Sequence, residues 1–287
     1  MKLKSLIKQL IPPIMLKIFN FSSKKQLQPT FSNFKEALAN AGSYEDEVLI
    51  KVIVAKTLKF IEEFEMNSTI SFENLSNSRT VRTLLAVISG VNKKTNELTV
   101  LDFGGSAGVH YFTARQILNS NIKLNWLIVE TQSMVQEAKA SGLENDELKF
   151  FASIKEAKDN YKTFDVVYSN YALCYTPNPL DYLSQLLKLN FKILYITNTA
   201  LNENNEEVTG LQSSFLSTNG IGREIPTHLN IKDKKIQYPF VIPSKKIFEN
   251  LIIKYGEIIS VIKESSSTYY TDKGNFDNYG YFVKKIN

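Results

Sequence analysis

The middle of the chain alternates between short apolar runs and amphipathic segments. The apolar runs, rich in Val, Ile and Phe, are Leu98–Phe103, Trp126–Glu130, Leu148–Phe151, Phe164–Ser169 and Phe191–Thr197. Between them, helical periodicity predicts helices at about 109–119, 133–141, 154–160 and 179–189. This alternation is typical of βαβ units. We therefore expect an α/β fold with a Rossmann-like, doubly wound sheet that carries helices on both faces.

The alternation stops after Thr197. Residues 200–242 form a long polar stretch with several Gly and Pro residues, and a segment of this length inside a compact domain usually has a function. The pattern then predicts a helix over 243–254 and two strands, Ile258–Lys263 and Tyr279–Ile286. We expect about seven strands in all, with a late antiparallel strand.

Two helices are predicted before the alternating region. Residues 46–64 carry an apolar stripe at helical spacing, and residues 79–91 carry another, with Val81, Leu84, Leu85 and Ile88 predicted to face inward. A shorter amphipathic segment lies in residues 1–21, where leucines and isoleucine share one face and three lysines share the other. It either lies on an anionic membrane surface or packs on its own domain, and both readings stay open.

Composition narrows the class of protein. The chain has 287 residues, 43% hydrophobic and 22% charged, which excludes a disordered class. No apolar run is long enough to span a membrane, and no secretory signal is evident. The net charge of +5 comes almost entirely from lysines spread along the chain, so we expect no nucleic-acid partner.

With Cys174 as the single cysteine, an intrachain disulfide is excluded. A cytoplasmic protein is expected, with peripheral contact at the inner membrane face as the alternative that residues 1–21 leave open.

The candidate chemistry lies in the segment from Val100 to Gly108, which reads VLDFGGSAG. An apolar strand runs directly into a glycine-rich turn, and a helix follows. Glycines let a backbone turn tightly and approach a ligand, and a helix N-terminus offers free N–H groups to a negative charge. In open α/β sheets this position, outside the carboxyl end of a strand, is where ligands bind.

The spacing of the glycines selects among phosphate and nucleotide motifs. The lysine of a P-loop is missing, and neither Gly104 nor Gly105 starts a G-x-G-x-x-G frame. The pattern that remains resembles motif I of the class I methyltransferases that use S-adenosyl-L-methionine (SAM), with Ser106 where a glycine is usual. The next predicted strand ends at Glu130, where a carboxylate can accept hydrogen bonds from two ribose hydroxyls.

The resemblance extends over most of the chain from residue 28. The chain is similar to a family of SAM-dependent methyltransferases found among surface-polysaccharide biosynthesis genes. The segments that carry the similarity are Phe31–Ala41, the helix beginning at Glu45, LDFGGSAGVHYF, Trp126–Glu130, Ser169–Tyr175, Asn178-Pro179 and Leu183. It thins after Thr197, where Asn198-Thr199-Ala200 stands in place of the family's Arg-Thr-Pro, so no acceptor role of that arginine transfers.

The resemblance implies a division of the chain and a set of site residues. It implies an N-terminal helical extension or cap over 1–95 and a methyltransferase-like domain over 96–287, with an acceptor-side insertion at 200–242. The residues expected to bind SAM are Asp102, Gly104, Gly105, Ser106, Gly108, Tyr111, Glu130, Ser169 and Asn170. Core packing is the alternative for Tyr111. The chain has two histidines. His228, in the long polar segment, is the candidate base in preference to His110 at the start of the helix after the glycine turn, and a surface or loop-stabilising role is the alternative for His228. No metal is expected, because the loop after Phe164–Ser169 lacks a ligand cluster.

Three functions remain open at this point. The first is transfer of a methyl group to an oxygen or nitrogen of a small molecule or glycan precursor. The second is a non-catalytic scaffold in surface-glycan assembly. The third is a nicotinamide-dependent oxidoreductase, which the broken glycine frames and the late strand pair disfavour, since an antiparallel strand inserted beside the fifth marks the methyltransferase variant of the fold. The oligomeric state is left open.

Overall fold

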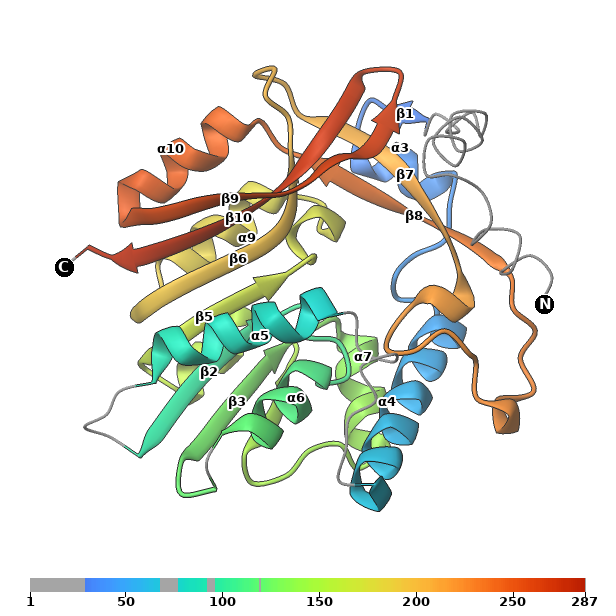
Figure 1. The fold of residues 1–287 in the computed structure, drawn as a ribbon. Coiled ribbons are helices and arrows are strands. Elements are labelled where there is room, and N and C mark those ends of the chain that lie inside the picture. The colour runs from blue at the N-terminus through green and yellow to red at the C-terminus, as the bar shows by residue number, and fades with distance from the viewer. Residues whose placement is uncertain (1–28, 68–76, 92–95, 119, 287) are drawn as a thin grey trace, which may run out of the picture.

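The computed structural model describes residues 29–67, 77–91, 96–118 and 120–286. The amphipathic segment predicted over 1–21 lies outside these residues. The described chain is built on two sheets, one of seven strands and one of three (Figure 1).

The seven-stranded sheet has the order β4-β3-β2-β5-β6-β10-β9. Its strands are β2 (Glu97–Phe103), β3 (Lys123–Val129), β4 (Leu148–Phe151), β5 (Phe164–Asn170), β6 (Phe191–Leu201), β9 (Gly256–Thr271) and β10 (Gly274–Lys285). The first five are parallel to one another, and β10 lies antiparallel between β6 and β9. The predicted α/β class, the seven strands and the late antiparallel strand beside the fifth are confirmed.

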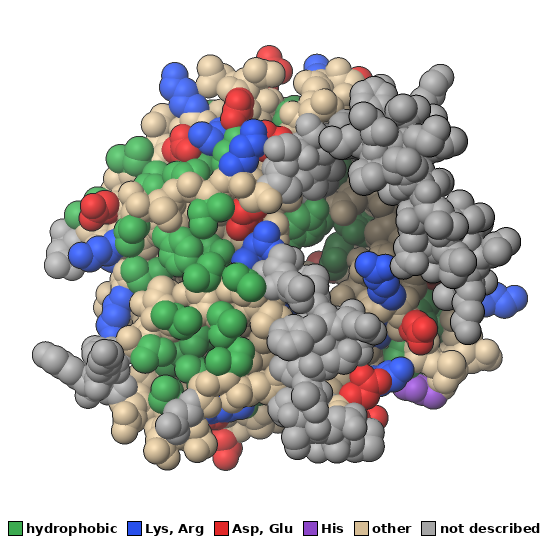
Figure 2. Space-filling view, in the orientation of Figure 1, with side chains coloured by type: hydrophobic (Ala, Val, Ile, Leu, Met, Phe, Trp, Pro, Cys, Tyr) green, Lys and Arg blue, Asp and Glu red, His purple; other side chains and the backbone are tan. Residues whose placement is uncertain are grey.

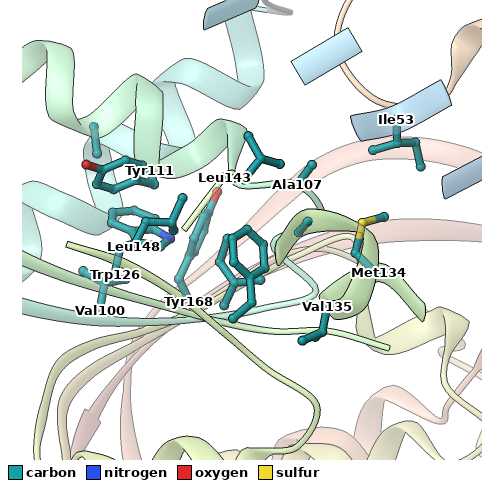
Figure 3. Close-up of a cluster of buried hydrophobic side chains, with 14 of the residues drawn as sticks. Ile53, Val100, Ala107, Tyr111, Trp126, Met134, Val135, Leu143, Leu148 and Tyr168 are labelled. Carbon is teal, nitrogen blue, oxygen red and sulfur yellow. The ribbon is translucent and has the colours of Figure 1, made fainter. Parts of the chain in front are cut away.

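Helices cover both faces of this sheet and bury a core on each. On one face the core includes side chains of α4 (Glu47–Asn67), α5 (Asn77–Gly90), α6 (Val109–Ile117) and α7 (Gln132–Ala140). Figure 3 shows part of it, with Trp126 of β3 next to Tyr111 and Leu148 at one end of the cluster, and Met134 and Val135 of α7 at the other. The other face is covered by α8 (Ile154–Asn160), α9 (Pro179–Leu187) and α10 (Lys245–Tyr255). Because the central strands run parallel to one another, their carboxyl ends lie together at one end of the sheet.

A second sheet is formed by segments far apart in the sequence. Its order is β1-β7-β8, from β1 (Thr30–Phe31), β7 (Val208–Phe215) and β8 (Lys235–Ile242), all antiparallel. The short helix α3 (Phe34–Ala39) and the 3-10 turns η2 (Leu216–Thr218) and η3 (Thr227–Leu229) belong to the same region, and η1 (Leu173–Tyr175) follows β5. The polar stretch 200–242 therefore contains two strands that its composition did not predict.

The inward face predicted for residues 79–91 is wrong. On α5 the side chains of Val81, Leu85 and Ile88 are 51%, 40% and 67% exposed, and Leu84 is half-buried. The opposite face packs on the sheet, through Thr80, Thr83, Ala86, Val87 and Gly90. Small residues allow the helix axis to approach closely, and a Cβ at Gly90 would collide with Val166. Apolar side chains over α5 are visible on the surface in Figure 2.

Candidate functional site

A cavity of about 600 Å³ lies at the carboxyl ends of β2, β3, β5 and β6. The glycine turn and the strand ends form one side of it, and Tyr44, Ile53 and Gly220 line the other. In Figure 2 the molecular surface is hollowed between the part built on the seven-stranded sheet and the part that contains β8. The volume lies in the range of cavities that hold small organic ligands and cofactors.

The glycine turn takes its shape from contacts that only glycine allows. Gly104 has φ of 71°, and a Cβ there would collide with Ala172. A Cβ on Gly105 would lie 2.6 Å from a carboxylate oxygen of Asp102. The turn is therefore pressed against the strand end behind it, while Gly104, Gly105 and Ser106 face the cavity. Gly108, at φ of 92°, precedes α6 and faces Leu148 in the core.

Glu130 lies directly after β3 and ties the turn to the neighbouring strand end. Its Oε1 accepts the Ser106 N–H at 3.0 Å and its Oε2 accepts the Thr131 N–H at 2.9 Å. Burial raises the pKa of Glu130, and the nearby carboxylates of Asp102 and Glu45 add to that rise against the two backbone hydrogen bonds. A carboxylate has about four acceptor positions, so Glu130 retains acceptor capacity toward the cavity that it lines.

A chain of polar side chains crosses the strand ends beneath the cavity. His110 Nδ1 lies 2.9 Å from Asp102 Oδ2, which also accepts the Trp126 Nε1–H at 3.1 Å. His110 Nε2 lies 3.3 Å from Asn170 Nδ2. This series of hydrogen-bonded side chains continues to β6, where Asn198 Nδ2 donates to Asn170 Oδ1 at 2.9 Å. It therefore connects β2, α6, β5 and β6.

Four tyrosines from three parts of the chain form an aromatic wall, which comprises Tyr44, Tyr171, Tyr175 and Tyr238. Tyr44 stacks on Tyr175 with ring centroids 5.2 Å apart, and Tyr238 meets both rings edge-on. Tyr171 lies 5.6 Å from Tyr175. Three of the four line the cavity, and Tyr238 of β8 supports them from behind. The wall joins the second sheet to the strand ends.

Lys56 of α4 fastens the segment after β7 to the rest of the site. Its ammonium donates to the backbone oxygens of Ser217, Asn219 and Gly222 at 2.8, 2.5 and 3.1 Å. Burial is the main cause that lowers the pKa of Lys56 to about 8. The segment held in this way supplies Gly220 to the cavity.

Two of the four arginines in the chain lie on α5 and line the cavity. Arg82 pairs with the buried Glu264 of β9 at 3.2 Å, and Glu264 also accepts hydrogen bonds from Thr197 and the Asn198 N–H. Burial lowers the pKa of the Arg79 guanidinium. The cavity thus contains cationic groups near Asn198 as well as the carboxylate of Glu130.

The structure brings five of the predicted site residues together on the cavity, namely Gly104, Gly105, Ser106, Glu130 and Asn170. Asp102, Gly108, Tyr111 and Ser169 are buried next to it without lining it. Tyr111 packs in the core, and its hydroxyl donates to Glu147 at 3.1 Å. His228 is exposed on η3, outside the cavity lining. The roles proposed for these residues stay predictions.

Several cavity residues were not singled out from the sequence as site residues. Arg79, Tyr44 and Gly220 lie on segments with no motif, and nothing in their local pattern marks them. Asn198 carried a signal, because it stands where the similar family has an arginine at the end of the fifth parallel strand. His110 was considered as a base from the sequence and His228 was preferred; the contact of His110 with Asp102 became evident only with the geometry.

Comparison with known proteins gives structural neighbours alone. No protein-family model matches the sequence, and no curated protein matches it. Similar solved structures include a SAM-dependent methyltransferase from Clostridium acetobutylicum, 11% identical over 81% of this chain and 99% of that chain, with a TM-score of 0.47. An O-methyltransferase from Bacillus cereus in complex with SAH is 15% identical over 87% and 96%, at 0.44. The N-terminal domain of EvdMO1, in the presence of SAH and D-fucose, is 11% identical over 73% and 84%, at 0.45.

At this level of similarity, the ligands of these neighbours do not transfer to the present chain. Among the described helices, none is both long and apolar enough to cross a membrane.

Proposed function

We propose that the protein binds SAM and transfers its methyl group to an oxygen or nitrogen of a small molecule or glycan precursor. One observation carries the proposal. The glycine turn after β2 and the carboxylate after β3 face a single cavity, on a sheet in which β10 is inserted antiparallel beside β6. The strand order also argues against a nicotinamide enzyme, whose doubly wound sheet is typically parallel in the order 3-2-1-4-5-6.

The residues present fit the proposed cofactor. Gly104 and Gly105 let the turn pack directly on Ala172 and Asp102, and its backbone faces the cavity where a ligand would bind. Glu130 has acceptor capacity left for ribose hydroxyls. We refer to this part, Gly104–Ser106 with Glu130, as the cofactor half of the cavity. SAM supplies a methyl group that is already activated by a sulfonium.

Another part of the cavity, with Tyr238 behind it, would bind the acceptor. We refer to His110, Asn170, Asn198 and the tyrosines of the aromatic wall as the acceptor half. The protein has to align an acceptor atom with the methyl group and keep water out. Aromatic faces pack against the C–H face of a sugar ring, and amide side chains hydrogen-bond its hydroxyls. This chemistry supports a carbohydrate-like acceptor, in line with the family resemblance to enzymes of surface-polysaccharide biosynthesis.

Calorimetry with SAM on the purified full-length protein tests the cofactor. We expect micromolar binding by the wild type and binding about 10–100-fold weaker in Glu130→Ala, because loss of hydrogen bonds to a charged group costs about 1.5–3 kcal/mol. Glu62→Ala is the control, since Glu62 is exposed on α4. A folded wild-type protein that binds no SAM would refute the proposal.

Labelled methyl transfer then identifies the acceptor. SAM with an isotopically labelled methyl group is incubated with free monosaccharides, nucleotide-activated sugars and a matched set of amines. Labelled product with any of them supports an enzyme and names its acceptor class. SAM binding with no transfer to any acceptor would favour the alternative of a non-catalytic scaffold in glycan assembly.

A further inference from the structure

His110 is held in one orientation by buried partners. Its side chain lies in the first turn of α6 and is 8% exposed, while that of Asp102 is fully buried. An ionised carboxylate only accepts hydrogen bonds, so the ring nitrogen that faces Asp102, Nδ1, carries the hydrogen. Trp126 donates to the same oxygen and fixes the carboxylate from the other side. The neutral imidazole therefore directs the lone pair of Nε2 away from Asp102.

The group that meets Nε2 is a donor. Asn170 Nδ2 lies 3.3 Å from it, longer than the usual 2.9–3.0 Å of an N–H···O bond. The Asn170 amide is placed with Nδ2 toward His110 and Oδ1 toward Asn198, whose amide donates to it at 2.9 Å. The imidazole, Asn170 and Asn198 all line the cavity. A lone pair and an N–H group are thus presented side by side to whatever enters.

A hydroxyl group matches this pair, since it donates one hydrogen bond and accepts another. Its O–H would donate to Nε2 of His110, and its oxygen would accept from Asn170 Nδ2. A neutral amine has a single lone pair, which would form the bond to the methyl group and so leave the Asn170 N–H without an acceptor. The weak contact between the two side chains is replaced by two hydrogen bonds.

We propose that the acceptor is an alcohol or phenol, that His110 is the base that removes its hydroxyl proton, and that Asp102 is a positioning residue for His110. The proposal rests on the proposed methyl transfer. The bound cofactor supplies the methyl group, and its sulfur keeps the electron pair of the broken bond. On the protein side, the O–H bond breaks, the proton joins Nε2, and the oxygen's electron pair forms the bond to carbon. The imidazolium is held by Asp102 and returns its proton to water.

The surroundings of the ring contain charges of both signs. Tyr168 of β5 meets the imidazole edge-on with centroids 5.1 Å apart. The other titratable and charged groups of the neighbouring elements that line the cavity near it include Glu45 before α4, Arg79 and Arg82 on α5, Glu130 after β3, and Tyr171, Tyr175 and Tyr182 after β5. The carboxylate of Asp102 is the one in hydrogen-bond contact, so it governs the orientation of the ring.

Imidazole nitrogen NMR tests the orientation without cofactor or acceptor. The chain has two histidines, so His228→Asn assigns the signals, and the exposed His228 serves as the reference. We expect His110 to carry its hydrogen on Nδ1 when neutral, and Asp102→Asn to shift that hydrogen toward Nε2. A hydrogen on Nε2 of His110 in the wild type would overturn the proposal.

Kinetics test the role in proton removal. His110→Asn keeps a side-chain N–H for Asp102 and removes Nε2. We expect methyl transfer to the identified acceptor to fall by about 10²–10⁴-fold, the acid limb of the pH–rate profile to disappear, and SAM affinity to stay within about threefold. Glu62→Ala, at an exposed position on α4, should leave all three unchanged. Unchanged transfer in His110→Asn, or an amine as the methylated group, would overturn the inference, whereas absent SAM binding in the wild type would refute methyl transfer itself.

Discussion

The cofactor half and the acceptor half of the cavity differ in the chemical groups that form them and in where these groups lie in the sequence. The cofactor half comes from the short stretch between Gly104 and Glu130, and it presents a glycine turn and one carboxylate. The acceptor half draws on segments from Tyr44 to Tyr238 and presents side chains, most of them aromatic or amide. A cofactor that many enzymes share can be bound by one compact backbone turn. Binding of a particular acceptor instead requires side chains from distant parts of the chain.

The two halves touch at Gly104, and a single methyl group there should disturb both. Gly104→Ala would collide with Ala172, which precedes η1 and lies between Tyr171 and Tyr175 of the aromatic wall. We expect SAM binding to weaken by more than about 100-fold and stability to fall by about 2–4 kcal/mol, because left-handed strain and a steric clash add. Calorimetry and urea denaturation measure these effects.

Gly142→Ala is the matched control for that substitution. Gly142 has the same φ of 71°, but a Cβ there meets nothing within 4 Å. It should therefore cost only the left-handed strain, about 1–2 kcal/mol, with SAM binding unchanged. Equal losses in the two variants would show that contact with Ala172 does not matter.

Lys56→Met tests the two halves independently, because it removes hydrogen bonds on the acceptor side only. The folded pKa of Lys56 is about 8, below the ordinary value of 10.5. Between these values the unfolded chain binds more protons, so this group makes the free energy of unfolding rise with pH from about 8 upward. We expect that rise to be smaller in Lys56→Met than in the wild type when urea denaturation at pH 7.5 and pH 9.5 is compared.

Lys51→Met on the exposed side of α4 controls for the lost charge. It should retain the pH-dependent rise of the wild type. In Lys56→Met, SAM affinity should stay within about threefold, since the substitution leaves the cofactor half intact. A large loss of SAM affinity would contradict the division into two halves.

The smallest effect is expected at the aromatic wall. Tyr175→Phe keeps the stacked ring and removes a hydroxyl that donates to Gln212 at 2.6 Å. The expected loss of stability is about 1 kcal/mol, measured by thermal unfolding, with no change in SAM affinity. Tyr175→Ala should instead raise the KM of the acceptor, and an unchanged KM would exclude Tyr175 from the acceptor half.

The sequence predicted the cofactor half better than the acceptor half for a physical reason. Tight turns need particular residue types at consecutive positions, so VLDFGGSAG and the acid at 130 leave a local pattern. Asn198 and Tyr44 meet Asn170 and Tyr175 only through the fold. The wrong prediction of the inward face of α5 has a related cause. Helix periodicity identifies large apolar residues, whereas the face that packs on the sheet carries small residues such as Ala86 and Gly90.

The left-handed backbone angles near the strand ends could not be predicted from the sequence either. Ser106, Tyr171 and Asn198 are non-glycine residues with φ between 53° and 60°, and all three line the cavity. Left-handed backbone in such residues costs free energy and persists where the surroundings enforce it. Their clustering at one edge of the sheet became evident only in the assembled fold.

The insertion of β10 between β6 and β9 has a consequence for synthesis on the ribosome. When residues 191–201 have emerged, β6 has its neighbour β5 on one side, but its other neighbour comes from residues 274–285. Until then the growing chain exposes an unpaired strand edge rich in apolar residues, the kind of surface that recruits foreign strands. Release of a chain that stops before residue 274 should therefore yield aggregates, whereas the complete chain covers this edge with β10.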